Sequence, residues 1–409
     1  MNINKAVKYN LLITLVSKGL SFLLFILLAK TLSIKEYGEL TYILMVLTIM
    51  PVLHFGCSNG AIITLPRILS NSNDTEEYKS YFERFNSVSN IIQLFSCLIL
   101  ILFIQKNSLP LIVVIIASFL LSKYIENVQL FFNSKMEFYK ANQIKALDLI
   151  LKPGLAILCL FINDDILYVF IGYLISSCLS FTLSLYLMKG ARFHLPGLPY
   201  VHSLFNVGFI IYLTWLLDLA FRSIDRWFIA SFYTEHDLGV YGFTSNLSLN
   251  IWLLAISFFG PYSQLLYKQV ASGDFESVKE TVTLANNKVF KFVAMLSLIS
   301  ISLYPIFTEY FIGKYQQSFY LFFLLVIVSV LLSVNNMYIY YIVSSGRTLI
   351  LLKIQLLILL LNVTLNCFVA YWNGDISYFA YATILSLVIY HLFLRFFYSN
   401  DILKRKLVS

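Results

Sequence analysis

The chain has 409 residues, of which 59% are hydrophobic and only 12% are charged. A soluble domain averages about 25% charged residues, so this composition excludes a soluble globular protein and indicates a polytopic helical membrane protein. The net charge of +8 does not indicate nucleic-acid binding, because excess Lys and Arg in a membrane protein mark cytoplasmic loops first. The five cysteines lie inside apolar runs without metal-ligand or disulfide spacing, and we expect neither metal nor cofactor.

Apolar runs of about 20 residues or more predict membrane-spanning helices. The sequence contains twelve: 10–31, 38–65, 86–105, 109–132, 144–162, 166–188, 204–232, 239–270, 288–312, 318–344, 349–372 and 376–398. The second and eighth are unusually long, and each could kink at a proline, Pro51 or Pro261. Lys18 interrupts the first run and no small-residue cleavage site follows it, so we expect an uncleaved helix and not a signal peptide.

Basic residues predict the orientation. If both termini are cytoplasmic, twenty Lys and Arg lie in cytoplasmic loops or termini, and only Lys30, Lys35, Lys106 and Lys314 lie on the opposite side. Cytoplasmic loops carry an excess of Lys and Arg, so we expect cytoplasmic N- and C-termini and an even number of spans.

Two pairs of segments resemble each other. Residues 29–38 match 230–239 at an offset of 201, and residues 165–168 match 375–378 at an offset of 210. Each segment carries Ser, Thr or an acid before the next run, as a helix cap requires. We therefore expect two pseudo-symmetric six-helix bundles with a site between them. Clustered Gly and Pro predict the boundaries: an N-terminal bundle at 1–190, a cytoplasmic linker at 191–199 and a C-terminal bundle at 200–409.

The seventh run, 204–232, carries four charges near its middle. At about 100° per residue, Asp218, Arg222 and Asp225 lie within about 60° on one helix face, with Arg226 beside them. A charge at membrane depth costs from about 2.5 to more than 10 kcal/mol unless it faces protein, a partner or water. The four residues are either a structural ion-pair cluster or part of a transport path. We favour the path, with Arg222 and Arg226 binding phosphate through their forked donors and Asp218 and Asp225 coupling transport to an ion.

Three lysines are further candidates for substrate binding. Lys152 lies four residues after Asp148, so the two could form a pair within one helix, or Lys152 could line a cavity. Lys18 and Lys353 lie within reach of the cytoplasmic face, where snorkelling to the membrane surface is the alternative.

Amides form the last group of candidates. Asn250 and Asn362 could bind sugar hydroxyls, although contacts between helices are the commoner role of membrane asparagines. The sequence has no phosphate-binding loop, zinc-ligand spacing or GxSxG motif. We therefore expect no catalytic residues, no enzyme activity and no ATP hydrolysis, and active transport would draw on a gradient.

Several short motifs resemble a known family. They are Leu28–Ser33 with Tyr37-Gly38, Asp225-Arg226 followed by Gly239–Tyr241, and Leu360–Asn366 before Gly374. They are similar to the polysaccharide-transport branch of the multidrug/oligosaccharidyl-lipid/polysaccharide (MOP) exporter superfamily, which includes the Wzx-type O-antigen and capsule flippases. The family usually has an arginine where Lys30 stands.

The resemblance implies a V-shaped, MATE-like pair of six-helix bundles in the bacterial inner membrane. It also implies a substrate, an oligosaccharide linked to undecaprenyl pyrophosphate, that crosses from the cytoplasmic to the periplasmic leaflet. Membrane lipids and other polysaccharide assembly proteins would be the partners, and nucleic acid would not.

Two other functions stay open. A MATE-type cation or drug antiporter would need acids unbalanced by bases. We instead count five intramembrane bases against four acids: Lys18, Lys123, Lys152, Arg222 and Arg226 against Glu126, Asp148, Asp218 and Asp225. A membrane-embedded polymerase or glycosyltransferase usually needs a large extramembrane loop, and no outside loop between the twelve runs is longer than about ten residues.

Overall fold

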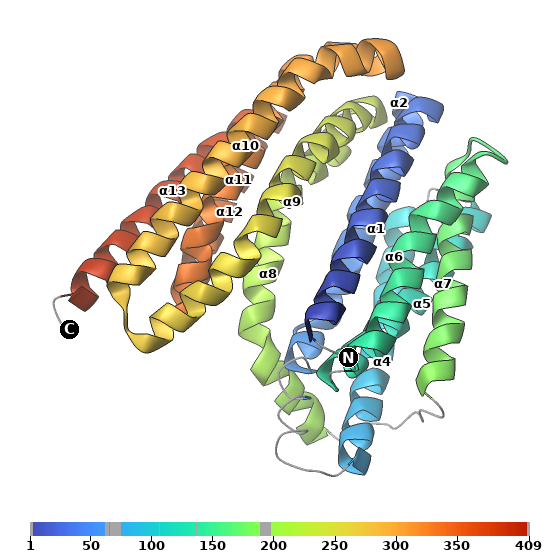
Figure 1. Ribbon diagram of the computed structural model, residues 1–409. Helices are drawn as coiled ribbons and strands as arrows, with labels where there is room; N and C mark the ends of the chain where they lie inside the picture. The colour runs from blue at the N-terminus through green and yellow to red at the C-terminus, as the bar shows by residue number, and fades with distance from the viewer. Residues whose placement is uncertain are drawn as a thin grey trace. The chain divides into compact units, whose positions relative to one another are not determined.

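The computed structural model describes residues 3–61, 65, 75–105, 107–135, 137–188 and 198–406 (Figure 1). No β-strand occurs in these ranges, which confirms the all-α prediction. The α-helices with bounds in the described part are α1 (Ile3–Thr31), α2 (Ile34–Ile49), α4 (Thr75–Ile104), α5 (Leu109–Ser134), α6 (Phe138–Leu160), α7 (Ile166–Met188), α8 (Leu198–Phe232), α9 (Glu235–Ser272), α10 (Phe275–Phe311), α11 (Phe319–Ser344), α12 (Thr348–Tyr371) and α13 (Ser377–Lys406).

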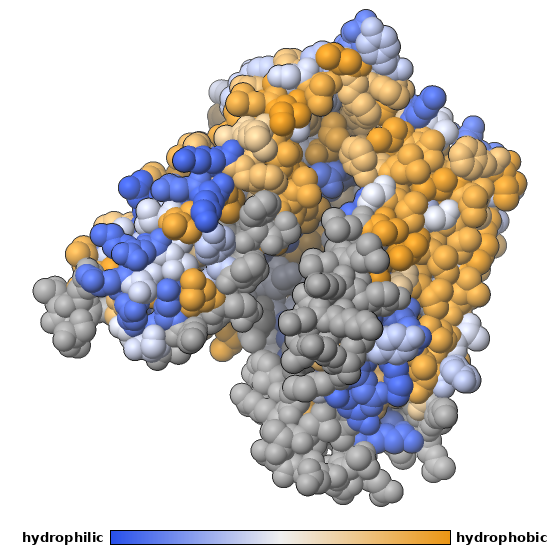
Figure 2. All heavy atoms as spheres, viewed as in Figure 1, coloured by the Kyte–Doolittle hydropathy of each residue, from blue (hydrophilic) through white to orange (hydrophobic). Residues whose placement is uncertain are grey.

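The helices have the length and composition of membrane spans. Within the described residues, seven are long and apolar enough to cross a bilayer by those two criteria. Figure 2 shows a broad hydrophobic surface over the described residues, with hydrophilic residues gathered in separate patches. The protein is a multi-pass membrane protein, and every predicted span overlaps a helix of the structure.

The chain divides into two compact units. The first comprises residues 1–33 and 42–212, and the second comprises 34–41 and 213–409. In the first unit α6 packs on α1 and α7, and in the second α11 packs on α9, α10 and α13. The division passes through α8 and assigns the start of α2 to the second unit. The predicted domain bounds at 190 and 200 stay a prediction, and residues 191–197 of the predicted linker lie outside the described residues.

The two long runs behave differently at their prolines. In the second run α2 ends at Ile49, and a 3-10 helix, η1 (Met50–His54), begins with Pro51 in its first turn. Gly56 follows with a φ of 91°, a left-handed conformation that glycine adopts at no steric cost. The backbone N–H of Gly56 donates to Nδ1 of His54 at 2.9 Å. The α-helix is thus interrupted at Pro51, where the sequence allows a kink, whereas α9 continues as α-helix past Pro261.

The repeated segments meet in the second unit. A Cβ atom on Gly38 would lie 1.9 Å from the carbonyl oxygen of Glu235, and one on Gly239 would lie 2.1 Å from that of Ile34. Gly239 lies 201 residues after Gly38 and Glu235 lies 201 residues after Ile34, so the contact between the starts of α2 and α9 is reciprocal. Only glycine allows backbones this close, and the resemblance between the segments therefore has a structural cause.

Caps begin the helices after several loops. Thr234 and Asp237 form a capping box at the start of α9, in which Asp237 N–H donates to Thr234 Oγ1 at 3.2 Å. Asp375 Oδ1 accepts from the backbone N–H of Ser377 at 2.8 Å at the start of α13. At the opposite end of α9, Asp274 caps α10, and hydrogen bonds from Ser277 lower the pKa of its exposed carboxyl. The capping expected from the sequence is thus present in both repeated segments of the second half.

Stacked aromatic rings fill one end of the second unit. The ring of Tyr315, in the 3-10 helix η2 (Gly313–Ser318), stacks on Phe243 of α9 with centroids 4.0 Å apart. Tyr304 of α10 stacks on Phe322 of α11 at 4.2 Å. Such pairs add about 0.5–1.5 kcal/mol beyond the area that they bury, so this end of the unit is firmly packed.

Candidate functional site

The charged residues of α8 form the main candidate site. Arg222 Nη2 lies 2.6 Å from Asp218 Oδ2, and the two side chains are 21% and 35% exposed. Arg222 Nε donates to the Asp218 carbonyl oxygen at 3.3 Å. The guanidinium carbon lies 4.7 Å from the centre of the Trp252 ring on α9. Arg222 is therefore paired with an acid one turn earlier and covered on one face by an aromatic ring.

Asp225 has a different set of partners. Its side chain is buried, and it accepts hydrogen bonds from the hydroxyl of Tyr241 on α9 and from the backbone N–H of Arg226, the latter at 2.9 Å. Arg226 Nη2 donates to the carbonyl oxygen of Arg222 at 3.2 Å. The helical period brings Asp218, Arg222 and Asp225 to one face. A buried carboxylate requires hydrogen-bond donors. For Asp225, the side-chain donor is Tyr241 on α9.

Two small cavities adjoin these residues inside the second unit. One, of about 30 Å³, is lined by Asp218, Trp252, Gln355 and Tyr390 among others. The other, of about 20 Å³, is lined by Arg222, Asp225 and Arg226. A water molecule needs about 10–15 Å³ of such volume. Each cavity therefore has room for a water or two and none for a sugar.

Polar atoms with unused hydrogen-bonding capacity line the larger cavity. Asn335 Nδ2 is buried without a hydrogen-bond partner among the described residues, and the neighbouring side chains of Gln355 and Tyr390, which interact with each other, leave further hydrogen-bonding capacity unused. Leaving a buried polar atom unpaired costs about 1–3 kcal/mol, so these atoms favour a hydrated cavity next to Asp218.

The first unit contains its own ion pairs. Lys152 Nζ lies 3.1 Å from Asp148 Oδ1 and donates to Ser122 Oγ at 3.2 Å, which confirms the pair predicted within α6. Lys123 in α5 pairs with Glu126 at 3.1 Å. Both lysines are thus held by an acid on their own helix, and Lys152 is also joined to α5.

The remaining candidates for substrate binding differ in how exposed their side chains are. Lys18 in α1 and Lys353 in α12 have exposed side chains, as snorkelling requires. Asn250 donates to the Asn246 carbonyl within α9 at 2.8 Å.

Asn362 is completely buried in α12. Its Nδ2 lies 3.3 Å from both Thr383 Oγ1 and Ser386 Oγ of α13, and its Oδ1 accepts from Asn366 at 2.9 Å. These bonds join α12 to α13, which is the interhelical role that the sequence favours for this amide.

Sequence reasoning missed the side chains that surround the α8 charges. Tyr241, which binds Asp225, lies in one of the motifs that carry the family resemblance, so a signal for it existed. Trp252, Gln355 and Tyr390 come from three other helices, and nothing in the sequence connects them with α8.

Comparisons with known proteins agree with this fold. The profile of the family described as "Polysaccharide biosynthesis protein" matches residues 3–263. No curated protein matches the chain.

Among solved structures, the lipid II flippase MurJ in an inward closed conformation has a TM-score of 0.74 at 16% identity, covering 97% of this chain and 90% of that chain. An inward-facing multidrug resistance MATE family transporter of the MOP superfamily has a TM-score of 0.68 at 14% identity, covering 94% and 96%. At these identities the likeness shows the shared fold.

Proposed function

We propose that this chain, which belongs to the polysaccharide biosynthesis protein family, is a flippase for lipid-linked oligosaccharides. The family match over residues 3–263 is the observation that carries the proposal. The fold is also that of a protein described as a lipid II flippase, matched over nearly all of this chain, so it suits cargo that joins a lipid to a polar head.

The specific cargo comes from the resemblance to Wzx-type flippases. It is an O-antigen or capsule repeat unit on undecaprenyl pyrophosphate, moved across the bacterial inner membrane by alternating access. The excess of basic residues on one side supports cytoplasmic termini. The similar solved structures are transporters and a flippase, which supports transport without catalysis.

Arg222 and Arg226 are our leading candidates for the pyrophosphate. Guanidinium groups match phosphate oxygens through two parallel donors, and the Arg222 side chain retains 21% exposure despite its pair with Asp218. Lys152 is a further candidate, since it is partly exposed beside Asp148. Lys18, Lys353 and Asn250 are weaker candidates that supply exposed or half-buried polar groups.

Asp218 and Asp225 are the proposed ion-coupling residues. Asp218 borders a cavity with room for water, and Asp225 is buried against Tyr241. Taking up a proton or another cation at either carboxylate would change its hydrogen bonds to α8 and α9. Proton or cation binding shifts the equilibrium between two conformations only if its free energy differs between them. That difference is the condition for coupling.

Deleting the gene tests the cargo. We expect the lipid-linked repeat unit to accumulate on the cytoplasmic side of the membrane and the purified protein in proteoliposomes to move it without ATP. If the deletion strain distributes the lipid-linked unit normally but loses cation or drug export, the flippase proposal is wrong and the protein is an antiporter.

A further inference from the structure

A large pocket opens at one end of the second unit. It has a volume of about 940 Å³ and lies where α8 leads into α9, η2 leads into α11 and α12 leads into α13. Ligand pockets typically have about 300–1,000 Å³. None of its lining residues borders the two small cavities beside the α8 charges, so it is a separate site.

Tyrosine rings form one wall of this pocket. Tyr320, Tyr378 and Tyr381 are 53%, 54% and 44% exposed. The rings of Tyr378 and Tyr381 have centroids 6.3 Å apart, and the hydroxyls of Tyr320 and Tyr381 share a hydrogen bond. An aromatic face is electron-rich, so it suits the flat face of a pyranose, where C–H groups carry slight positive charge.

The charged lining residues have both signs. Asp237 and Asp375 contribute carboxylates, each with one oxygen engaged in a helix cap and the other left to accept from a ligand, and Lys314 contributes an ammonium group. Ionised carboxylates only accept hydrogen bonds, so they suit the hydroxyls of a sugar and repel phosphate. The lysine in turn disfavours a simple cation. This combination selects an uncharged ligand that is rich in hydroxyl groups.

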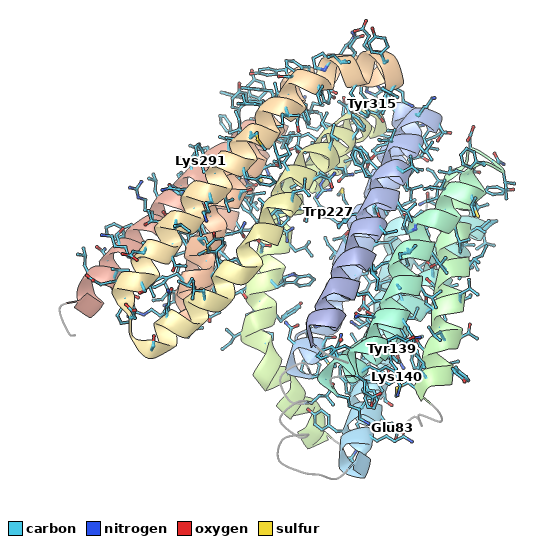
Figure 3. All side chains as sticks on the ribbon, viewed as in Figure 1. Glu83, Tyr139, Lys140, Trp227, Lys291 and Tyr315 are labelled. Atoms are coloured by element: carbon cyan, nitrogen blue, oxygen red, sulfur yellow. The ribbon has the colours of Figure 1, made fainter. Side chains whose placement is uncertain are left out.

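Buried contacts hold the pocket in shape. Tyr315, labelled in Figure 3, is 1% exposed and stacks on Phe243, and its hydroxyl has no hydrogen-bond partner in the described part of the chain. The Tyr233 hydroxyl donates to the Gly374 carbonyl at 2.6 Å and ties the end of α8 to the loop before α13. A pocket that is already formed loses less entropy when a ligand binds.

We propose that this pocket binds the uncharged sugar portion of the cargo, a role that rests on the proposed flippase function. It lies at the end of the second unit opposite the α9–α10 loop, which the distribution of basic residues assigns to the cytoplasm. It therefore receives the saccharide on the far side of the membrane, after the sugar has crossed. The pyrophosphate of the carrier is not its ligand.

Binding of free saccharides tests the inference without transport. The full-length protein in nanodiscs is titrated with maltotriose and N,N′-diacetylchitobiose as uncharged probes, with digalacturonate as an anion and with tetramethylammonium as a cation, and binding is followed by saturation-transfer NMR. We expect an uncharged saccharide to bind. Asp375→Asn and Tyr378→Ala should each weaken that binding about tenfold, the loss expected from one hydrogen bond to a charged group or one ring contact.

A tyrosine outside the pocket supplies the matched control. Tyr310 at the end of α10 is 76% exposed and does not line the pocket, so Tyr310→Ala should leave saccharide binding unchanged. Equal losses at Tyr310 and Tyr378 would show a band of interfacial tyrosines and overturn the inference. Binding of tetramethylammonium alone, or of no uncharged probe, would overturn it as well.

A transport assay distinguishes failure of this inference from failure of the proposed function. If the wild-type protein moves no lipid-linked saccharide in proteoliposomes, the flippase function fails whatever the NMR shows. If the wild type moves it and the Asp375 and Tyr378 variants bind and transport like the wild type, only the pocket inference fails.

Discussion

Replacing Arg222 distinguishes a ligand from a structural ion pair. Arg222→Ala removes a pair of 2.6 Å with Asp218 and a contact of 4.7 Å with the Trp252 ring. If Arg222 binds pyrophosphate, transport should fall sharply while the protein still inserts in the membrane. If it is structural, the unpaired Asp218 should lower the amount of folded protein, and activity should fall in proportion.

The structure sets the size of both effects. An i,i+4 helix pair exposed to water contributes about 0.3–0.5 kcal/mol, and a cation over an aromatic ring contributes about 0.5–2 kcal/mol. Because the Arg222–Asp218 pair is only partly exposed, the loss of stability should be at least about 1 kcal/mol. A hydrogen bond to a charged group is worth about 1.5–3 kcal/mol, so losing the phosphate contact should reduce transport about ten- to hundredfold, at 1.4 kcal/mol for each factor of ten.

Two further variants complete the assay. Arg222→Lys keeps the charge but loses the fork, and we expect normal insertion with reduced transport. Arg222→Ala combined with Asp218→Ala removes both charges, which should restore the amount of folded protein measured by size-exclusion chromatography and leave transport in proteoliposomes low. Full transport by this double variant would refute a binding role for Arg222.

Three other measurements test the fold and its orientation. A cysteine at Asp164 should react with an impermeant thiol reagent from outside intact cells and one at Asp274 should not; labelling at Asp274 would reverse or break the topology. Gly38→Ala places a Cβ 1.9 Å from a backbone oxygen of α9 and should cost about 1–3 kcal/mol of stability. Gly19→Ala, which meets no atom within 4 Å, is its control, and equal thermal shifts would contradict the close contact. Asn362→Ala should destabilise the fold by about 1–3 kcal/mol, with transport per folded molecule unchanged; a selective loss of transport would make this amide a ligand.

Hydropathy predicted the helices well because the bilayer sets their length and permits little else. The break at Pro51 and the i,i+4 pair of Lys152 were also predictable, since both depend on neighbours along the chain. The hydrogen-bond partner of Asp225, in contrast, was not predictable from the sequence. Helical periodicity places residues on a face of their own helix, but Tyr241 reaches Asp225 from the next helix, and its register depends on packing that a single sequence does not specify.

The contact between Gly38 and Gly239 shows what a repeat can and cannot reveal. The offset of 201 residues identified both glycines, but not that their segments touch each other in one compact unit. Because α2 and α9 meet at equivalent positions of the repeat, Gly38 lies against the backbone of α9 and Gly239 lies against the backbone of α2. Each of the two positions therefore requires glycine. The assignment of residues 34–41 to the second unit follows from this contact and not from any composition change that would mark a boundary.

If Arg222 binds cargo as proposed, its pairing with Asp218 would also limit how tightly the cargo binds. A pyrophosphate that contacts Arg222 must compete with a carboxylate 2.6 Å away, so the net gain is the difference between two charge-assisted interactions and not the full value of one. A transporter needs that difference to be small, because cargo held too firmly at the first face would not leave at the second. The proposed exchange would also release Asp218, which borders a cavity with room for water. A carboxylate freed in this way would lack its cationic partner, and this would link the proposed cargo binding at Arg222 to the proposed ion coupling at Asp218 through one shared pair.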